Sequence, residues 1–207
     1  MLRTMTPLET KTVLLLIEAG EQSHWEYSAS LETPDGPLLE FSTEMLENQA
    51  NPSSMLLYCI SKFPKFVLHH NHLSGESLSG SDWRGASLYF NEIFAHCNDG
   101  TSYYGNVINH KRNLAFLFQT LEVNAQDLLF KHTDNPDIDG FFRKEVINRA
   151  FKIKGLVEYE YKWGTLSIPH QKIVNMNIPG IQSVGELGVM YDDAINKAAH
   201  NLSNMQW

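Results

Sequence analysis

Two histidines and one aspartate have the residue types and the spacing of a metal site. His70 and His72 are separated by one residue, and Asp82 follows ten residues after His72. In an extended segment alternate side chains point to the same side, so both imidazoles can reach one ion. If the chain between them folds back, Asp82 adds a carboxylate oxygen. Two nitrogens and one oxygen leave one position of a tetrahedral zinc site open, so we expect Zn²⁺ here to activate a water molecule for hydrolysis.

The elements that would position these ligands can be predicted from the flanking sequence. The apolar run Phe66-Val67-Leu68 within residues 65–70 is typical of a buried strand, which would end on the histidines. Residues 74–81 are rich in Ser and Gly and predict a loop. A helix is expected from about Asp82 to Cys97, with apolar residues spaced to cover one face. A plainer alternative stays open, in which Ser79 and Asp82 form an ordinary helix cap and the histidines lie in a solvated loop.

The chain before this segment predicts a helix, a hairpin and a second helix. Thr6, Pro7 and Glu9 form a capping-box pattern, which predicts a helix over residues 7–19 that stops at Gly20. Polar and apolar residues alternate over residues 25–31, and a Pro-Asp-Gly turn at 34–36 leads to a second strand around 38–41. A further helix is expected over residues 51–62.

The expected secondary structure becomes mostly helical after about residue 113. Residues 102–108 predict one more strand, and helices are expected over residues 114–131, 141–153 and 191–204, with strand-like runs at 156–161 and 165–168. We therefore divide the chain into a core at residues 5–112 and a mostly helical C-terminal extension at residues 113–207 that packs on it.

The residues from His70 to Asp82 resemble a known family motif. The segment His70-Asn71-His72-Leu73-Ser74-Gly75, with Ser79-x-x-Asp82 after it, resembles the motif of the JAMM, or MPN+, zinc metalloproteases. It is similar to the His-Asn-His-Pro-Ser-Gly form of their RadC-like bacterial JAB branch. The resemblance covers roughly residues 5 to 110. It implies an α/β (α+β) fold of the MPN/JAB type, similar to that of cytidine deaminases, with a central mixed β-sheet flanked by helices.

The resemblance also implies catalytic roles. Family members use a glutamate on an early strand as general base, and Glu26 matches that place best, with Glu21 as the substitute. The plainer alternative is that Glu26 faces solvent. Ser79 matches the family serine that donates a hydrogen bond to the developing oxyanion, and His69 should point away from the ion. Two departures stand out, because Leu73 replaces the usual proline and the loop before Asp82 is about one or two residues short.

Two functions follow as alternatives. The first is a zinc metallopeptidase that cuts a peptide or isopeptide bond in a protein or peptide substrate, including removal of ubiquitin or a ubiquitin-like modifier. The second is a non-catalytic MPN-type interaction or assembly module, in which the short loop has lost catalytic geometry. The oligomeric state is open.

Composition limits the classes of partner and the cellular compartment that we expect for this chain. The net charge of −8, without a long run of Lys and Arg, disfavours a nucleic-acid partner. The apolar run at residues 13–17 is far too short to span a membrane. Cys59 and Cys97 stand alone in apolar helical patterns, which predicts buried thiols in a reducing cytoplasm. Non-classical export to a host cell stays open.

Overall fold

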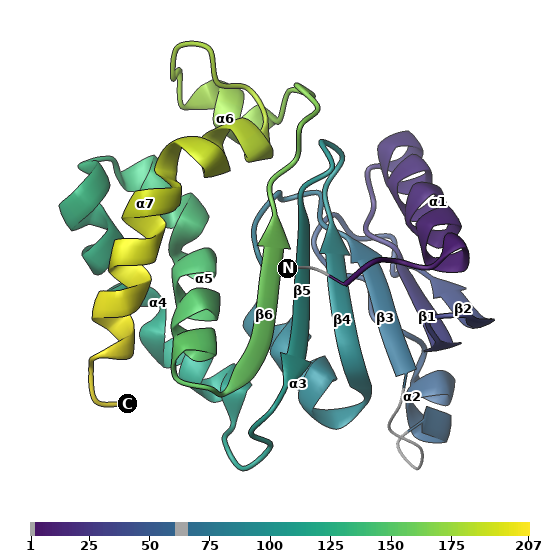
Figure 1. The fold of residues 1–207 in the computed structure, drawn as a ribbon. Coiled ribbons are helices and arrows are strands. Elements are labelled where there is room, and N and C mark those ends of the chain that lie inside the picture. Colours follow the sequence, from purple (N-terminus) through teal and green to yellow (C-terminus); the bar gives the residue numbers. More distant parts are fainter. Residues whose placement is uncertain (1–2, 61–65) are drawn as a thin grey trace.

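A six-stranded mixed β-sheet flanked by helices forms the centre of the molecule (Figure 1). The computed structural model describes residues 3–60 and 66–207. The strand order is β2-β1-β3-β4-β5-β6; β3 and β4 run parallel, and the other neighbours are antiparallel. The strands are β1 Ser28–Thr33, β2 Gly36–Ser42, β3 Phe66–Asn71, β4 Phe90–His96, β5 Ser102–Val107 and β6 Val157–Lys162. The expected mixed sheet is confirmed.

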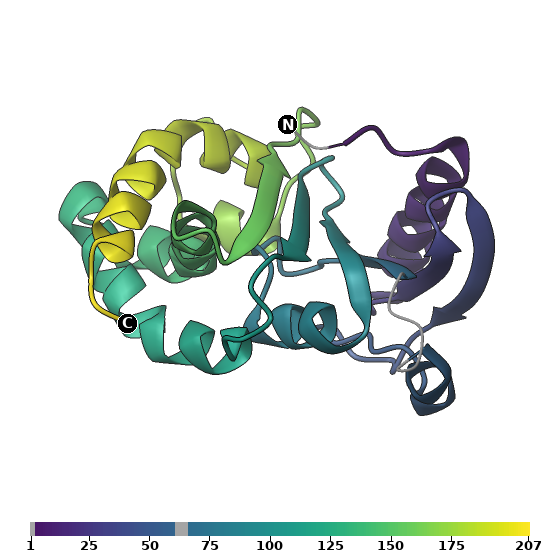
Figure 2. The same ribbon diagram turned by 60° about the horizontal axis from the view of Figure 1, so that its bottom comes forward.

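Helices cover both faces of this sheet. They are α1 Pro7–Ser23, α2 Ser54–Ile60, α3 Gly80–Leu88, α4 Leu114–Thr133, α5 Pro136–Ile153, α6 Gln171–Asn175 and α7 Val184–Ser203. Helix α1 packs on the face that carries Val67, Phe94 and Tyr104, whereas α3 packs on the opposite face. Figure 2 shows α4, α5 and α7 gathered at the β6 end of the sheet, away from α1.

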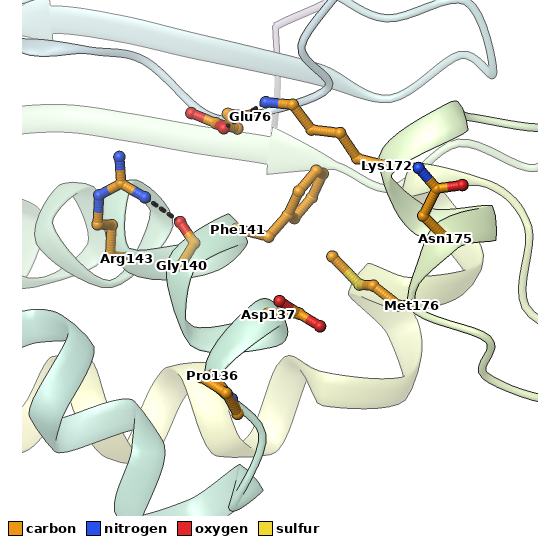
Figure 3. A pocket seen from close by; sticks show the side chains of 9 residues that line it. All are labelled: Glu76, Pro136, Asp137, Gly140, Phe141, Arg143, Lys172, Asn175 and Met176. Atoms are coloured by element: carbon orange, nitrogen blue, oxygen red, sulfur yellow. Dashed lines mark hydrogen bonds and ion pairs between the residues drawn. The ribbon is translucent and has the colours of Figure 1, made fainter.

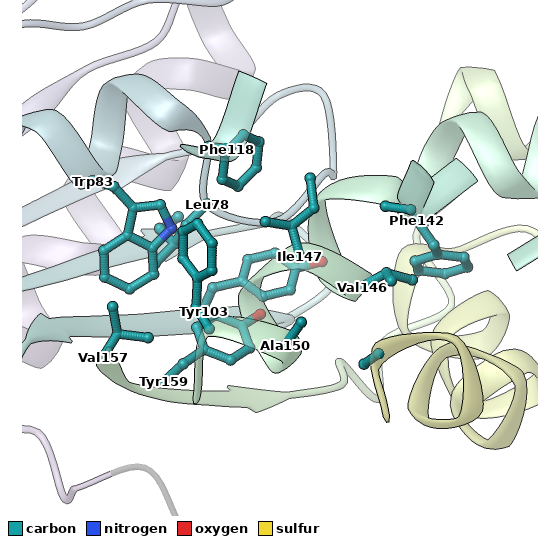
Figure 4. Close-up of a cluster of buried hydrophobic side chains, with 14 of the residues drawn as sticks. Leu78, Trp83, Tyr103, Phe118, Phe142, Val146, Ile147, Ala150, Val157 and Tyr159 are labelled. Atoms are coloured by element: carbon teal, nitrogen blue, oxygen red, sulfur yellow. The ribbon is translucent and has the colours of Figure 1, made fainter. Parts of the chain in front are cut away.

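One large hydrophobic cluster joins the sheet to the second half of the chain. Trp83 of α3, Tyr103 of β5 and Tyr159 of β6 are fully buried in it, together with aromatic side chains of α4 and α5 (Figure 4). Strand β6 extends the sheet by pairing with β5 from Val107↔Val157 to Ser102↔Lys162. Residues 113–207 therefore supply a strand of the central sheet as well as the helices packed on it.

The N-terminal predictions hold except at one helix end and one strand start, since the strand predicted over residues 25–31 is β1 and begins at Ser28. Thr6 and Glu9 make the reciprocal capping box with Pro7 at the first helical position, and the hairpin β1–β2 follows. The predicted stop at Gly20 is wrong, because α1 continues to Ser23 and ends at His24, which has a left-handed backbone with φ 61°. Gly20 is buried where α1 crosses Asn71, so its missing side chain permits close packing.

The predicted helix from Asp82 to Cys97 is also wrong beyond its second turn. Helix α3 ends at Leu88, and residues 90–96 form β4. This strand lies in the middle of the sheet with helices on both sides, so Ile93 and Phe94 are buried on opposite faces. An apolar run buried on both faces has no alternation, and its spacing imitates a helix.

Several other predictions have clear outcomes. The strands predicted at 65–70 and 102–108 are β3 and β5, with residue 65 outside the described residues. The helix predicted over 51–62 is α2, and residues 61 and 62 also lie outside the described range. Residues 165–168 form no strand, and α6 was not predicted. Cys97 is buried but follows a strand, whereas Cys59 is exposed, against the prediction.

No helix within residues 3–60 and 66–207 is long and apolar enough to cross a membrane.

Candidate metal centre

The three predicted metal ligands meet at one point. His70 lies near the end of β3, His72 directly follows that strand, and Asp82 lies in the first turn of α3. His70 Nε2 is 2.8 Å from His72 Nε2 and 3.2 Å from Asp82 Oδ1, and His72 Nε2 is 3.9 Å from Asp82 Oδ2. All ligand atoms lie within 4.8 Å of one another. Two imidazole nitrogens and a carboxylate that converge in this way are a donor set suited to zinc.

Two of the three candidate ligands are held in the form that binds a metal ion. His72 Nδ1 donates to the carbonyl of Glu76 at 2.7 Å, which leaves the Nε2 lone pair for an ion. Burial, with the charge of His70, lowers the pKa of His72 to about 4. Burial acts to raise the pKa of Asp82, but the charge and hydrogen bond of His70 outweigh it, so this pKa lies below its usual range. At neutral pH His72 is neutral and Asp82 is ionised, as metal binding requires. Burial acts to lower the pKa of His70, but the charge and hydrogen bond of Asp82 outweigh it and raise this pKa, so a metal ion would displace a proton from His70.

Ser79 caps helix α3 and orients Asp82. Its hydroxyl accepts from the Asp82 backbone N–H at 3.3 Å and donates to Asp82 Oδ2 at 2.7 Å, while the Ser79 N–H donates to the same carboxylate at 2.6 Å. The structure therefore contains the ordinary cap, and this cap holds Asp82 beside His70. Ser79 also lines the cleft next to the ligands, and its role as an oxyanion donor stays a prediction.

Glu26 lies in the same cleft as the three ligands, from a distant part of the chain. The cleft has a volume of about 410 Å³, and Glu26, His70, His72, Ser79 and Asp82 all line it. Glu26 is only 4% exposed, so the plainer alternative, in which it faces solvent, is wrong. It precedes β1, which begins at Ser28, instead of lying within that strand.

The environment of Glu26 favours its protonated form. Burial and the nearby charge of Asp82 raise its pKa to about 7, although His70 and the backbone N–H of Leu73 act in the opposite direction. The substitute base Glu21 is exposed on α1 and is not among the residues lining this cleft. The structure thus brings Glu26, and not Glu21, to the ligands.

Asn71, the residue between the two histidines, holds the backbone on both sides of Glu26. Its side-chain oxygen accepts from the Tyr27 N–H at 2.6 Å, and its side-chain nitrogen donates to the Trp25 carbonyl at 3.3 Å. The Glu26 N–H itself donates to the Leu46 carbonyl at 2.8 Å. Sequence reasoning missed Asn71, although an asparagine at the end of a buried strand, pointing away from both ligands, was a usable signal.

The loop from His72 to Asp82 is fixed by the second half of the chain. Asn148 of α5 donates to Ser77 Oγ and to the Leu78 carbonyl, both at 2.8 Å, and accepts from Trp83 Nε1 at 2.7 Å. It is fully buried. No short motif signals such contacts, because they join residues about 65 to 71 positions apart.

Glu76, in the middle of this loop, is held by two lysines. Its carboxylate lies 2.6 Å from Lys144 Nζ of α5 and 3.0 Å from Lys172 Nζ of α6. Figure 3 shows Glu76 and Lys172 reaching toward each other above Phe141. Nearby, His170 Nε2 bonds to the Leu73 carbonyl at 2.9 Å. Because the Glu76 carbonyl receives the His72 N–H, these contacts position a ligand indirectly.

His69 points away from the ligands, as predicted. It is fully buried on the α1 side, where Nε2 lies 3.2 Å from Glu9 Oε1 and Nδ1 lies 3.0 Å from His96 Nε2. Its ring stacks on Phe94 with centroids 4.6 Å apart. His69 therefore links the ligand strand to the capping box of α1.

Comparisons of this chain with protein-family models, with curated proteins and with solved structures found no match.

Proposed function

We propose that this chain is a zinc-dependent metallopeptidase of the JAMM, or MPN+, type, which hydrolyses a peptide or isopeptide bond. The observation that carries the proposal is the burial of Glu26 in the cleft of His70, His72 and Asp82. A metal site that serves only structure does not need a buried carboxylate of raised pKa beside its ligands. The order of helix, hairpin, short helix, buried strand, motif loop, helix and strand also supports the fold that the resemblance implies.

The chain's own residues support this reaction. Zinc at His70, His72 and Asp82 would polarise the scissile carbonyl and lower the pKa of a water molecule toward about 7. Glu26 takes a proton from the attacking water and returns it to the leaving amine, the dual role of a general acid and base. Burial of Glu26 favours the protonated carboxyl that returns the proton, and the charge of a nearby zinc ion would favour the carboxylate that accepts it.

The remainder of the cleft fits a polypeptide substrate. Asn48, Gln49 and Asn51 line one side, and their amides can pair with the main chain of a bound peptide. Leu57 and Tyr89 add apolar surface. An isopeptide bond to ubiquitin or a ubiquitin-like modifier is the specific substrate that the resemblance implies, and we include it in the proposal.

Zinc content tests the metal site. Purified protein should contain about one zinc per chain by elemental analysis, and His72→Ala and Asp82→Ala should lose it. His200→Ala is the matched control, because this exposed histidine lies on α7. A metal-free wild type, or full zinc retention by both ligand variants, contradicts the proposal.

Turnover tests the base. Glu26→Gln should keep zinc and lose cleavage of a panel of peptides and modifier-linked proteins, whereas Glu21→Gln should keep both. Wild-type cleavage should stop with a chelator and return with zinc. Cleavage that survives Glu26→Gln removes this residue from the mechanism. Zinc binding without any wild-type cleavage favours the non-catalytic module.

A further inference from the structure

A basic groove lies beside the metal cleft. It has a volume of about 640 Å³ and runs between α3 and the residues that connect β5 to α4. Arg84 lines both this groove and the metal cleft, so the two are continuous at that side chain. Asp82, a predicted ligand, is two residues away on the same helix. A substrate held at the metal site can therefore extend into the groove.

The groove is positively charged in a negatively charged chain. Arg84, Lys111 and Arg112 line it with His110, and none of the described residues that line it is Asp or Glu. Within residues 3–60 and 66–207, no ion pair neutralises these three cations. The whole chain carries a net charge of −8, so this uncompensated positive surface is a local exception.

Two large apolar side chains lie beside the cations. Leu88, the last residue of α3, is 52% exposed, and Phe116, in the first turn of α4, is 61% exposed. Both line the groove. Cations next to exposed apolar side chains complement a peptide that carries carboxylates together with an apolar residue.

We propose that this groove binds an acidic segment of the polypeptide substrate next to the bond to be cut. The assignment rests on the proposed peptidase function, and it adds the chemical class of the substrate. Arg84 and Arg112 can each bind a carboxylate with two parallel hydrogen bonds, and Lys111 adds a third positive charge. Leu88 and Phe116 contact the apolar residue of the same segment.

A nucleic acid fits these observations less well. Three cations can neutralise few phosphates, whereas the remaining surface of a chain of net charge −8 repels a long polyanion. A short acidic peptide places its charge only where the groove is positive. The two ligands can be separated in one binding experiment.

Fluorescence anisotropy with a labelled peptide tests the groove. The probe is a glutamate-rich peptide with one leucine, and its partner has glutamine in place of every glutamate. Wild type at low ionic strength should bind the first more tightly, and added salt should weaken this binding. Lys111→Glu/Arg112→Glu should weaken it about tenfold or more, since each reversal replaces attraction by repulsion. Lys197→Glu, an exposed lysine on α7, is the control.

Several results would overturn the assignment. Equal affinity for the glutamate and glutamine peptides would do so, as would no binding by wild type or unchanged binding by the double variant. Tighter binding of a single-stranded RNA oligonucleotide than of the acidic peptide would also overturn it. Circular dichroism and zinc content of the double variant should match wild type, which excludes misfolding as the cause of lost binding.

This experiment is separable from the test of the peptidase. Peptide binding is measured a second time with Glu26→Gln and with a chelator present, so this second measurement needs neither turnover nor metal. If wild type binds the acidic peptide but holds no zinc, the peptidase proposal is refuted and the groove assignment is supported. If wild type cleaves its substrate but does not bind the acidic peptide, only the groove assignment is refuted. On a cleavable acidic peptide, the double variant should raise KM and leave kcat unchanged.

Discussion

Replacement of Asn148 by leucine should loosen the loop that carries the candidate site. Leucine has the same number and branching of side-chain heavy atoms as asparagine and is somewhat larger, so the change removes hydrogen bonds without opening a cavity. Ser77 Oγ keeps a partner, because it also bonds to the Tyr159 hydroxyl at 2.7 Å. The indole N–H of Trp83 and the carbonyl of Leu78 lose Asn148, their partner at 2.7 and 2.8 Å.

The magnitude follows from those two groups. Each buried polar group left unpaired costs about 1 to 3 kcal/mol, so Asn148→Leu should lower the free energy of unfolding by about 2 to 6 kcal/mol. That is a large share of the roughly 5 to 15 kcal/mol that typical domains have. Zinc should also bind more weakly, because Ser77 and Leu78 lie between the ligands His72 and Asp82.

Urea denaturation gives the first quantity, and competition with a chelator of known affinity gives the second. Asn201→Leu, on the exposed side of α7, is the control and should change neither. A loss of less than about 1 kcal/mol, together with wild-type zinc affinity, would refute the reasoning. The loop would then be fixed by its own sequence and not by α5.

Three further predictions concern other contacts. Glu9→Gln should lower the free energy of unfolding by on the order of 2 to 3 kcal/mol at pH 7 in urea titrations. Burial acts to raise the Glu9 pKa, but Arg3 and His69 outweigh burial and lower this pKa to about 2. The difference in free energy of unfolding between Glu9→Gln and wild type should therefore shrink as pH falls from about 4.5 toward 2. A difference that stays constant with pH would contradict this prediction. Gly20→Ala should lower the free energy of unfolding by about 1 to 3 kcal/mol and reduce cleavage while zinc is retained, because the added methyl group displaces Asn71. Cleavage at the wild-type rate would count against a role for Asn71 in positioning Glu26. A chelator should lower the Tm of zinc-loaded wild type by several degrees and leave that of His72→Ala unchanged, and equal shifts in both proteins would argue against the site.

The parts of the site that the sequence could predict are local. The two histidines need only an extended strand end to point together, and the capping pattern of Ser79 and Asp82 needs only four consecutive residues. The same holds for the capping box at Thr6 and Glu9, which forms as predicted. In each case the interacting groups are close in sequence, so short-range geometry determines the outcome.

The parts that could not be predicted depend on what the segment packs against. Residues 90–96 have helical apolar spacing, yet they form a central strand because both faces of the sheet are covered. Cys59 has apolar neighbours but lies on an exposed face of a short helix. Glycine commonly ends a helix, which is why the sequence predicts a stop at Gly20. Only the close approach of Asn71 explains why Gly20 lies within α1.

The two departures of the motif from the family pattern are compensated by contacts from outside the motif. Leu73 lacks the ring of a proline, but its carbonyl is held by His170, and the shortened loop is tied to Asn148 and to the lysines around Glu76. All these anchors come from residues 136–172, beyond the part of the chain whose sequence resembles the family. A preorganised ligand set requires a rigid loop, and here the rigidity comes from α5, α6 and β6. The C-terminal half thus takes part in the geometry of the candidate metal centre, and we expect substitutions there to alter zinc affinity before they alter the fold of the sheet.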